Sequence, residues 1–225
     1  MGEHWTGYIG QFHVHWDTLI TMWFAMLMVI LFSFLMTRKM SYIPSTLQAF
    51  GENLMKFFIG SVDIIGEDKK KHIPLVASLF LFILFANLMG QLPLRLIELK
   101  QGELASPTND INMTAAMAVL VLFYYLFTGI KAKGIRAICP AFSFVGIIEM
   151  FVNLLEMITR PFSLALRLFV NILVGEILVT ALLGICAYFL PLPMMLFEVL
   201  IAFIQAYVFM MLTVAYISSS VTENE

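Results

Sequence analysis

Charged residues are scarce in this chain of 225 residues: Asp, Glu, Lys and Arg make up 12% of it, and hydrophobic residues make up 61%. Soluble domains average about 25% charged and about 45–50% apolar residues. This composition, with a mean hydropathy of +0.93, excludes an ordinary soluble domain. We therefore expect an all-α integral membrane protein with room for about five or six helical spans of ~20 residues. No segment is long or polar enough for a separate domain, so residues 1–225 are expected to form one membrane domain.

The chain also lacks the residue arrangements that bind metals, haem or nucleotides. The two cysteines, Cys139 and Cys186, lack a metal-type spacing and are interpreted as packing thiols. All four histidines precede residue 73, so no pair of membrane histidines could hold a haem. The chain has no phosphate-binding loop, no nucleophile motif and no basic patch combined with aromatic residues. We expect no cofactor, no metal and no nucleic-acid partner.

Long apolar runs divide the chain into about five expected membrane helices. The first run is too long for a signal peptide and lacks a basic leader, so a retained span is expected. Over residues 41–71, apolar residues recur at helical spacing among polar ones, which is typical of an amphipathic helix on the membrane surface. The expected elements are an outer N-terminal segment at 1–16, a first span at 17–37, the amphipathic cytoplasmic-side segment at 41–71, a hairpin of spans at 73–93 and 112–130, and a second, long hairpin at 142–190 and 194–218.

Basic residues predict the orientation. They cluster at 38–39, 69–71 and 131–136, in loops that one topology places on the same side. The positive-inside rule makes that side cytoplasmic. Residues 1–16 and the polar loop at 94–111 are then expected on the outer side.

The apolar stretch at 142–190 admits two arrangements. As one helix it would be roughly 70 Å long at 1.5 Å per residue, too long to stand upright in a core of ~30 Å. It would therefore be strongly tilted. Alternatively, Pro161 breaks it into two upright spans. Periodicity does not decide between them.

Arg167 stands near the middle of the most hydrophobic part of the chain. From Phe162 to Leu190 the only charges are Arg167 and Glu176. A charge at the centre of a bilayer costs about 2.5–3.5 kcal/mol on insertion scales, and arginine cannot escape by losing its proton. Such a residue normally faces a partner or a water-filled cavity and marks an ion or substrate pathway.

Helical spacing relates the neighbouring polar residues to Arg167. Ser163, Arg167 and Asn171 are four apart in the sequence and share a face. Glu176 lies nine residues past Arg167, about 180° round the helix, so these two charges are not expected to pair. Polar groups on either side of Arg167 would form two half-paths for an ion, interrupted by a fixed cation.

Further polar residues in apolar segments have both functional and structural interpretations. Glu198 and Gln205 are seven apart on the last helix, as are Glu149 and Glu156 before the proline. Glu198 could instead form a hydrogen-bonded pair with Glu176 that fixes helix packing, and Gln205 could join two helices. An acid just before the third span, Asp110, fits a helix cap.

Four stretches resemble subunit a of the rotary F-type ATP synthases. Residues 163–171, Ser-Leu-Ala-Leu-Arg-Leu-Phe-Val-Asn, continue to Gly175-Glu176 and match the family's signature. Residues 197–216 are similar to its last helix, 87–93 to the end of its second span, and 107–114 to the start of its third. The stretches occur in the family's order from about residue 80 to the C-terminus.

The resemblance implies a non-catalytic stator subunit beside a rotating ring of c subunits. Its partners would be the c ring, the subunit b stalk, other ATP synthase subunits and membrane lipid, and chemistry on ATP would belong to other subunits. The resemblance favours one tilted helix over 142–190, with the last two helices against the ring. The expected location is a bacterial plasma membrane or, alternatively, the energy-transducing membrane of an organelle.

The resemblance also implies roles for individual residues. Arg167 aligns with the family's essential arginine, Val170 stands where many members have glycine, and Glu198 stands where some have histidine. The implied outer proton path contains Glu176, Glu198, Gln205, Asn112 and Asp110. The implied cytoplasmic path contains Asn171, Ser163, Glu156, Arg160 and Glu149.

Two other functions fit the composition. A proton-coupled secondary transporter could use Arg167 as an anion site, but that class often shows internal repeats and paired broken helices, and none is found here. A structural subunit of a respiratory complex would not need Arg167 on a different face from Glu176.

Overall fold

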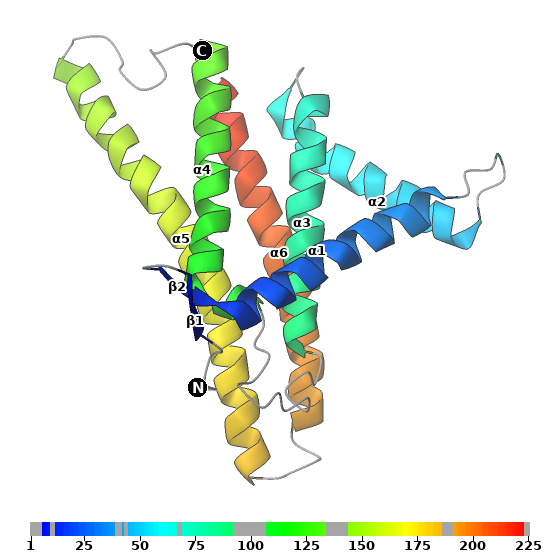
Figure 1. Cartoon of the computed structure of the whole chain (residues 1–225). Coiled ribbons are helices and arrows are strands. Elements are labelled where there is room, and N and C mark those ends of the chain that lie inside the picture. The colour runs from blue at the N-terminus through cyan, green and yellow to red at the C-terminus, as the bar shows by residue number, and fades with distance from the viewer. Residues whose placement is uncertain are drawn as a thin grey trace.

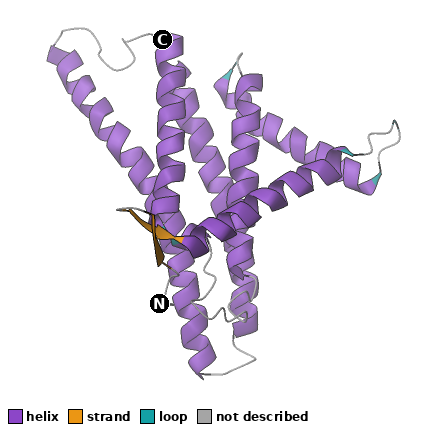
Figure 2. Cartoon of the chain, in the orientation of Figure 1, coloured by secondary structure: helices purple, strands orange, loops and turns teal. Residues whose placement is uncertain are grey.

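Helices make up nearly all of the part of the chain that the computed structural model describes (Figure 2). Five of them are long and apolar enough to cross a membrane, at Thr18–Thr37, Lys69–Gly90, Ile111–Ala132, Thr159–Val179 and Pro193–Val221. This confirms the expectation of an all-α integral membrane protein. The described residues are 6–9, 12–38, 42, 45–66, 69–91, 107–133, 144–185 and 191–222.

The elements follow the expected order with shifted ends. In chain order they are β1 (Thr6–Ile9), β2 (Phe12–His15), α1 (Trp16–Thr37), α2 (Thr46–Val62), the short 3-10 helix η1 (Asp63–Ile65), α3 (Lys69–Gln91), the 3-10 helix η3 (Pro107–Asn109), α4 (Ile111–Lys133), α5 (Phe144–Ile185) and α6 (Pro191–Thr222).

The amphipathic segment expected over 41–71 is shorter in the structure. Ser45 starts α2 by accepting a hydrogen bond from the backbone N–H of Gln48, which satisfies one of the free donors at a helix start. After η1 the chain turns at Gly66, whose φ of 91° suits glycine because it lacks a Cβ. Lys69–Lys71 therefore belong to the membrane helix α3 and not to the amphipathic segment.

Helix α5 runs unbroken through Pro161. It contains 42 residues, so at 1.5 Å per residue it is about 63 Å long, roughly twice the thickness of a ~30 Å hydrocarbon core. The chain therefore adopts one helix here and not two spans separated at the proline. In Figure 1, α5 is inclined relative to α4.

The core lies among α3, α4, α5 and α6. Large side chains from each of these helices are fully buried there, and α2 and η1 contribute from one end. Helix α6 packs along α3 and α4, while α5 packs on α4 and α6 (Figure 1). The buried set includes Val76, Ile83, Val121, Leu164, Leu168, Phe209, Val214 and Ile217.

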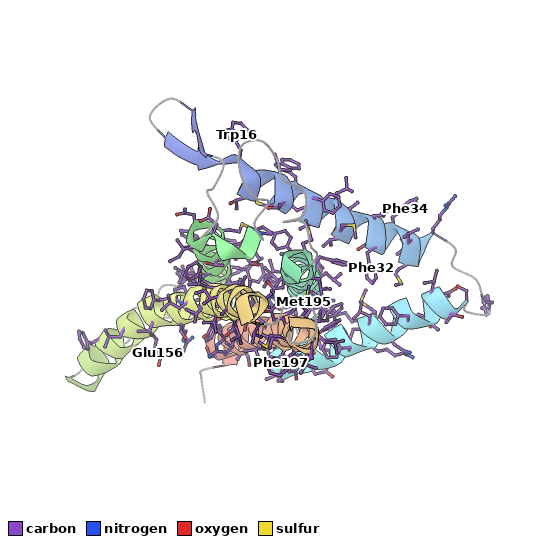
Figure 3. All side chains as sticks on the ribbon, turned by 90° about the horizontal axis from the view of Figure 1, so that it is seen from below. Trp16, Phe32, Phe34, Glu156, Met195 and Phe197 are labelled. Carbon is purple, nitrogen blue, oxygen red and sulfur yellow. The ribbon has the colours of Figure 1, made fainter. Side chains whose placement is uncertain are left out.

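Helix α1 lies obliquely across α3 at the periphery (Figure 1). Phe32 faces α3, where its ring meets that of Phe85 edge-on with centroids 5.5 Å apart, whereas Phe34 points outward (Figure 3). Near the start of α1, the Thr18 hydroxyl donates a hydrogen bond to an Asp110 carboxylate oxygen at 3.3 Å. This contact places the start of α1 beside the start of α4.

A small antiparallel hairpin precedes α1, which the sequence interpretation of residues 1–16 missed. Strands β1 and β2 pair in the register Thr6 to His15 and Ile9 to Phe12. These eight residues are the strand residues among those that the structure describes.

Candidate functional site

Helix α5 buries one side and leaves the side carrying Arg167 open. Leu164 and Leu168 are each 1% exposed and pack into the core. Ser163, Arg167 and Asn171, spaced one turn apart, are all exposed. Ser163 and Arg167 are open to the surroundings of the chain, whereas Asn171, at the edge of this face, reaches toward α6.

Apolar side chains surround Arg167 on that open face. Phe162 is 64% exposed and Val174 is 54% exposed, although both lie within the membrane-spanning part of α5. Helix α6 adds a second exposed apolar strip through Leu200 and Ile204. The result is a broad apolar surface with one fixed cation in the middle of the span.

A polar contact joins α5 to α6 one turn past Arg167. The Asn171 side-chain amide donates a hydrogen bond to Oε1 of the Gln205 side chain at 2.7 Å. Gln205 is 3% exposed and Glu198, two turns earlier on α6, is 8% exposed. Buried polar groups are costly without hydrogen bonds, so this contact positions both amides between the helices.

A small cavity lies beside this contact. It has a volume of about 20 Å³, and its polar lining comes from Asn87 on α3, Asn171 on α5, and Glu198 and Gln205 on α6. A cavity needs about 10–15 Å³ to hold one water molecule, which also needs two to four polar partners. Asn87 Oδ1 and Gln205 Nε2 are buried and make no hydrogen bond with the described residues, so an acceptor and a donor are free to bind a water there.

Gly175 allows Glu198 to reach the cavity. A Cβ atom at position 175 would lie 2.9 Å from Oε1 of Glu198, a separation too short for unbonded atoms. The absence of a side chain at Gly175 therefore sets how closely the carboxyl group approaches α5. The sequence analysis gave no role to Gly175 or Asn87. The amide of Asn87 within an otherwise apolar span could have indicated that this residue has a polar partner.

A second polar cluster lies nearer the start of α5, where Glu156 is visible in Figure 3. Glu156 and Arg160 form an ion pair one turn apart. Arg160 Nη1 also donates to the Ser219 hydroxyl at 3.1 Å, and its guanidinium lies 5.2 Å from the centre of the Tyr216 ring. These contacts tie α5 to the end of α6 and compensate the charge of Arg160.

One of the predicted outer-path residues, Asp110, caps α4, and a second, Asn112, donates to it. Asp110 accepts a hydrogen bond from the backbone N–H of Asn112 at 2.9 Å and from its side-chain amide at 3.0 Å. The prediction that Asp110 caps the third span is therefore confirmed. Asp110 and Asn112 do not line the cavity. Glu149 and Glu176 belong to α5, and their side chains lie outside the described residues.

The described residues contain no group of three or more His, Cys, Asp or Glu side chains that could hold a metal ion. The site consists of amides, carboxylates, hydroxyls and arginines. These groups can orient water, and the carboxylates can also take up and release protons.

Comparisons with known proteins agree with one another. The family model described as "ATP synthase A chain" matches residues 19–218. The protein named ATP synthase subunit a from Gloeobacter violaceus is 40% identical over 227 residues, covering 100% of this chain and 92% of the relative. Those named ATP synthase subunit a, chloroplastic, from Stigeoclonium helveticum and Bigelowiella natans are 38% and 37% identical and cover 100% of this chain. The matches span 92% and 93% of those two relatives.

Proposed function

The chain belongs to the ATP synthase A chain family, and on this basis we propose that it is the proton-translocating stator subunit of a rotary F-type ATP synthase. The observation that carries the proposal is the open face of α5. There Arg167 is exposed in the middle of a membrane span and surrounded by apolar side chains. A permanent cation in that position is stable only against a polar partner or water.

The partner we propose for this face is the ring of c subunits, which presents carboxylates at membrane depth. The apolar strips of α5 and α6 suit a sliding surface, because they offer few fixed hydrogen bonds to break as the ring turns. Arg167 attracts each carboxylate in its ionised form as it passes. The other proposed partners are the subunit b stalk and the remaining ATP synthase subunits. Chemistry on ATP is proposed to occur on those other subunits.

Protons from the outer side are proposed to reach the ring through the cavity beside Arg167. Glu198, Gln205 and Asn87 line it, and the path continues through Glu176, Asn112 and Asp110. A carboxyl group such as Glu198 can accept and release a proton, and a bound water could connect it to the amides. Neutralisation by such a proton allows a ring carboxylate to leave Arg167 and face lipid.

Protons are proposed to leave on the cytoplasmic side past Ser163. Asn171, which the resemblance placed on this path, instead lines the outer cavity together with Gln205, on the other side of Arg167 along α5. Below Ser163, Glu156 and Arg160 form the cluster at the end of α6, and Glu149 lies further along α5. Arg167 separates the two paths, since its positive charge repels a proton passing directly between them. The driving force is about 2.3 kcal/mol per charge for each 100 mV. The membrane is proposed to be a bacterial plasma membrane or an energy-transducing organelle membrane, and the chloroplastic relatives fit the latter.

Substitution of Arg167 tests the proposal. We expect Arg167→Ala to abolish ATP-driven proton pumping in inverted membrane vesicles while the complex still assembles. The matched control is Lys131→Ala, which removes an exposed cation at the end of α4 and should leave pumping unchanged. Normal pumping by an assembled Arg167→Ala complex would contradict the proposed role of the arginine.

A further inference from the structure

An apolar groove opens between α2 and the beginning of α3. It has a volume of about 350 Å³, within the range of about 300–1,000 Å³ that is usual for small-molecule sites. Met55 and Ile59 form its wall on α2, and Ile73 and Pro74 form its wall on α3. Met55 is 50% exposed and Ile59 is 40% exposed, so the wall is open to the surroundings of the chain.

Among the residues that the structure describes, two lysines are the charged residues that line this groove. Lys69 and Lys70 both contribute to it from the first turn of α3. Lys69 also pairs with Asp63 at 2.8 Å, whereas Lys70 forms no ion pair with any residue that the structure describes. A further lysine, Lys71, follows, and cations in the first turn of a helix are disfavoured by the helix dipole. An anion beside Lys70 would offset the charge of this lysine and its unfavourable place at the helix start.

The groove lies where a lipid molecule could reach it. Its lysines stand at the start of the candidate span Lys69–Gly90. Helix α2 combines polar and apolar residues at helical spacing, as helices at a membrane surface do. The lysines of this turn also belong to the side that the positive-inside rule makes cytoplasmic. Anionic lipids are concentrated in the cytoplasmic leaflet and attract basic residues near its surface.

We propose that this groove binds an anionic phospholipid, with an acyl chain against Met55, Ile59 and Ile73 and the phosphate beside Lys69 and Lys70. Charge complementarity selects this occupant over a zwitterionic lipid, whose headgroup carries no net charge to balance the lysines. The inference concerns a different face of the molecule from Arg167 and does not depend on the proposed path of the proton.

Photolabelling of the assembled complex tests the site. The complex is placed in nanodiscs made of equal amounts of phosphatidylglycerol and phosphatidylcholine, with a trace of either lipid carrying a photoreactive acyl chain. Adducts on peptides of α2 and α3 are then counted by mass spectrometry. We expect the phosphatidylglycerol probe to label these peptides more than the phosphatidylcholine probe. Lys70→Gln should reduce this preference about fivefold, the effect of one basic residue near an anionic lipid.

Matched variants separate loss of the site from general damage. Lys131→Gln removes an exposed lysine that does not line the groove and should keep the preference. Ile59→Trp fills the groove and should lower labelling by the phosphatidylglycerol probe, whereas Ile64→Trp, at an exposed residue outside the groove, should not. Equal labelling by the two probes in the unaltered complex would reveal only general lipid contact and overturn the proposal. Absence of labelling by both probes would mean that another subunit covers the groove, which would also overturn it.

Discussion

At the scale of single residues, the approach of Glu198 to α5 depends on a missing side chain. Gly175 leaves the space that Oε1 of Glu198 occupies, and Asn171, one turn earlier on α5, holds Gln205. The two contacts set the shape of the cavity from the same helix. A methyl group at position 175 would therefore force the Glu198 carboxyl group to shift.

We therefore expect Gly175→Ala to slow proton flux through the membrane sector. Overpacking of a close contact costs about 1–3 kcal/mol, and here the strain falls on a side chain of the proposed path. Gly184→Ala is the matched control, because a Cβ there would meet nothing within 4 Å. Proton uptake by vesicles stripped of the soluble head measures the effect. Equal flux in the two variants would show that the position of Glu198 does not limit transport.

Residue spacing predicted part of the site, and the reason is geometric. Ser163, Arg167 and Asn171 share a face because a helix fixes the relation between residues four apart. The cavity lined by Asn87, Glu198 and Gln205 involves two stretches that are far apart in the sequence. No local pattern carries that information, since it depends on how α3 and α6 pack together.

At the scale of elements, the Arg160 cluster fixes α5 against α6 near the end of the pair. Arg160 contacts an acid on its own helix and a hydroxyl and an aromatic ring on the other. Glu156 takes part only in the ion pair with Arg160. The arginine therefore contributes more to the joint between the helices than the glutamate does.

Substitution of the two residues should separate these contributions. Glu156→Gln removes a partly exposed ion pair and should lower stability by at most about 1 kcal/mol. Arg160→Ala should lower it further, because it also removes the hydrogen bond to Ser219, and such charged hydrogen bonds contribute about 1.5–3 kcal/mol. Thermal unfolding of the purified complex would rank the variants. A larger loss in Glu156→Gln would contradict this account of the joint.

Element boundaries were predicted less well than element types. The apolar runs located all five membrane helices, but Lys69–Lys71 were assigned to the amphipathic segment because charged residues usually lie outside a span. The structure includes them in α3, since a helix can extend beyond its apolar part. Pro161 left two arrangements open in the sequence, because the packing of α5 on its neighbours decides whether the helix continues through it.

At the scale of the whole molecule, a hydrogen bond places the start of α1 beside the start of α4. Thr18 on α1 contacts Asp110 at the start of α4, so the hairpin of β1 and β2 lies near that end of α4. Lys131 is at the other end of α4. Tyr42, beyond the end of α1, is fully exposed. If α1 crosses the membrane despite its oblique path, Thr6 and Tyr42 must lie on opposite sides.

Single cysteines at these positions would test that topology. With Cys139 and Cys186 replaced by serine, we expect Thr6→Cys and Ile111→Cys to react with a membrane-impermeant thiol reagent only in right-side-out vesicles. Tyr42→Cys and Lys131→Cys should react only in inverted vesicles, because the basic loops are retained on the cytoplasmic side. Reaction of Thr6→Cys and Tyr42→Cys from the same side would mean that α1 lies along the membrane surface. In that case four helices, and not five, would carry the chain across the bilayer.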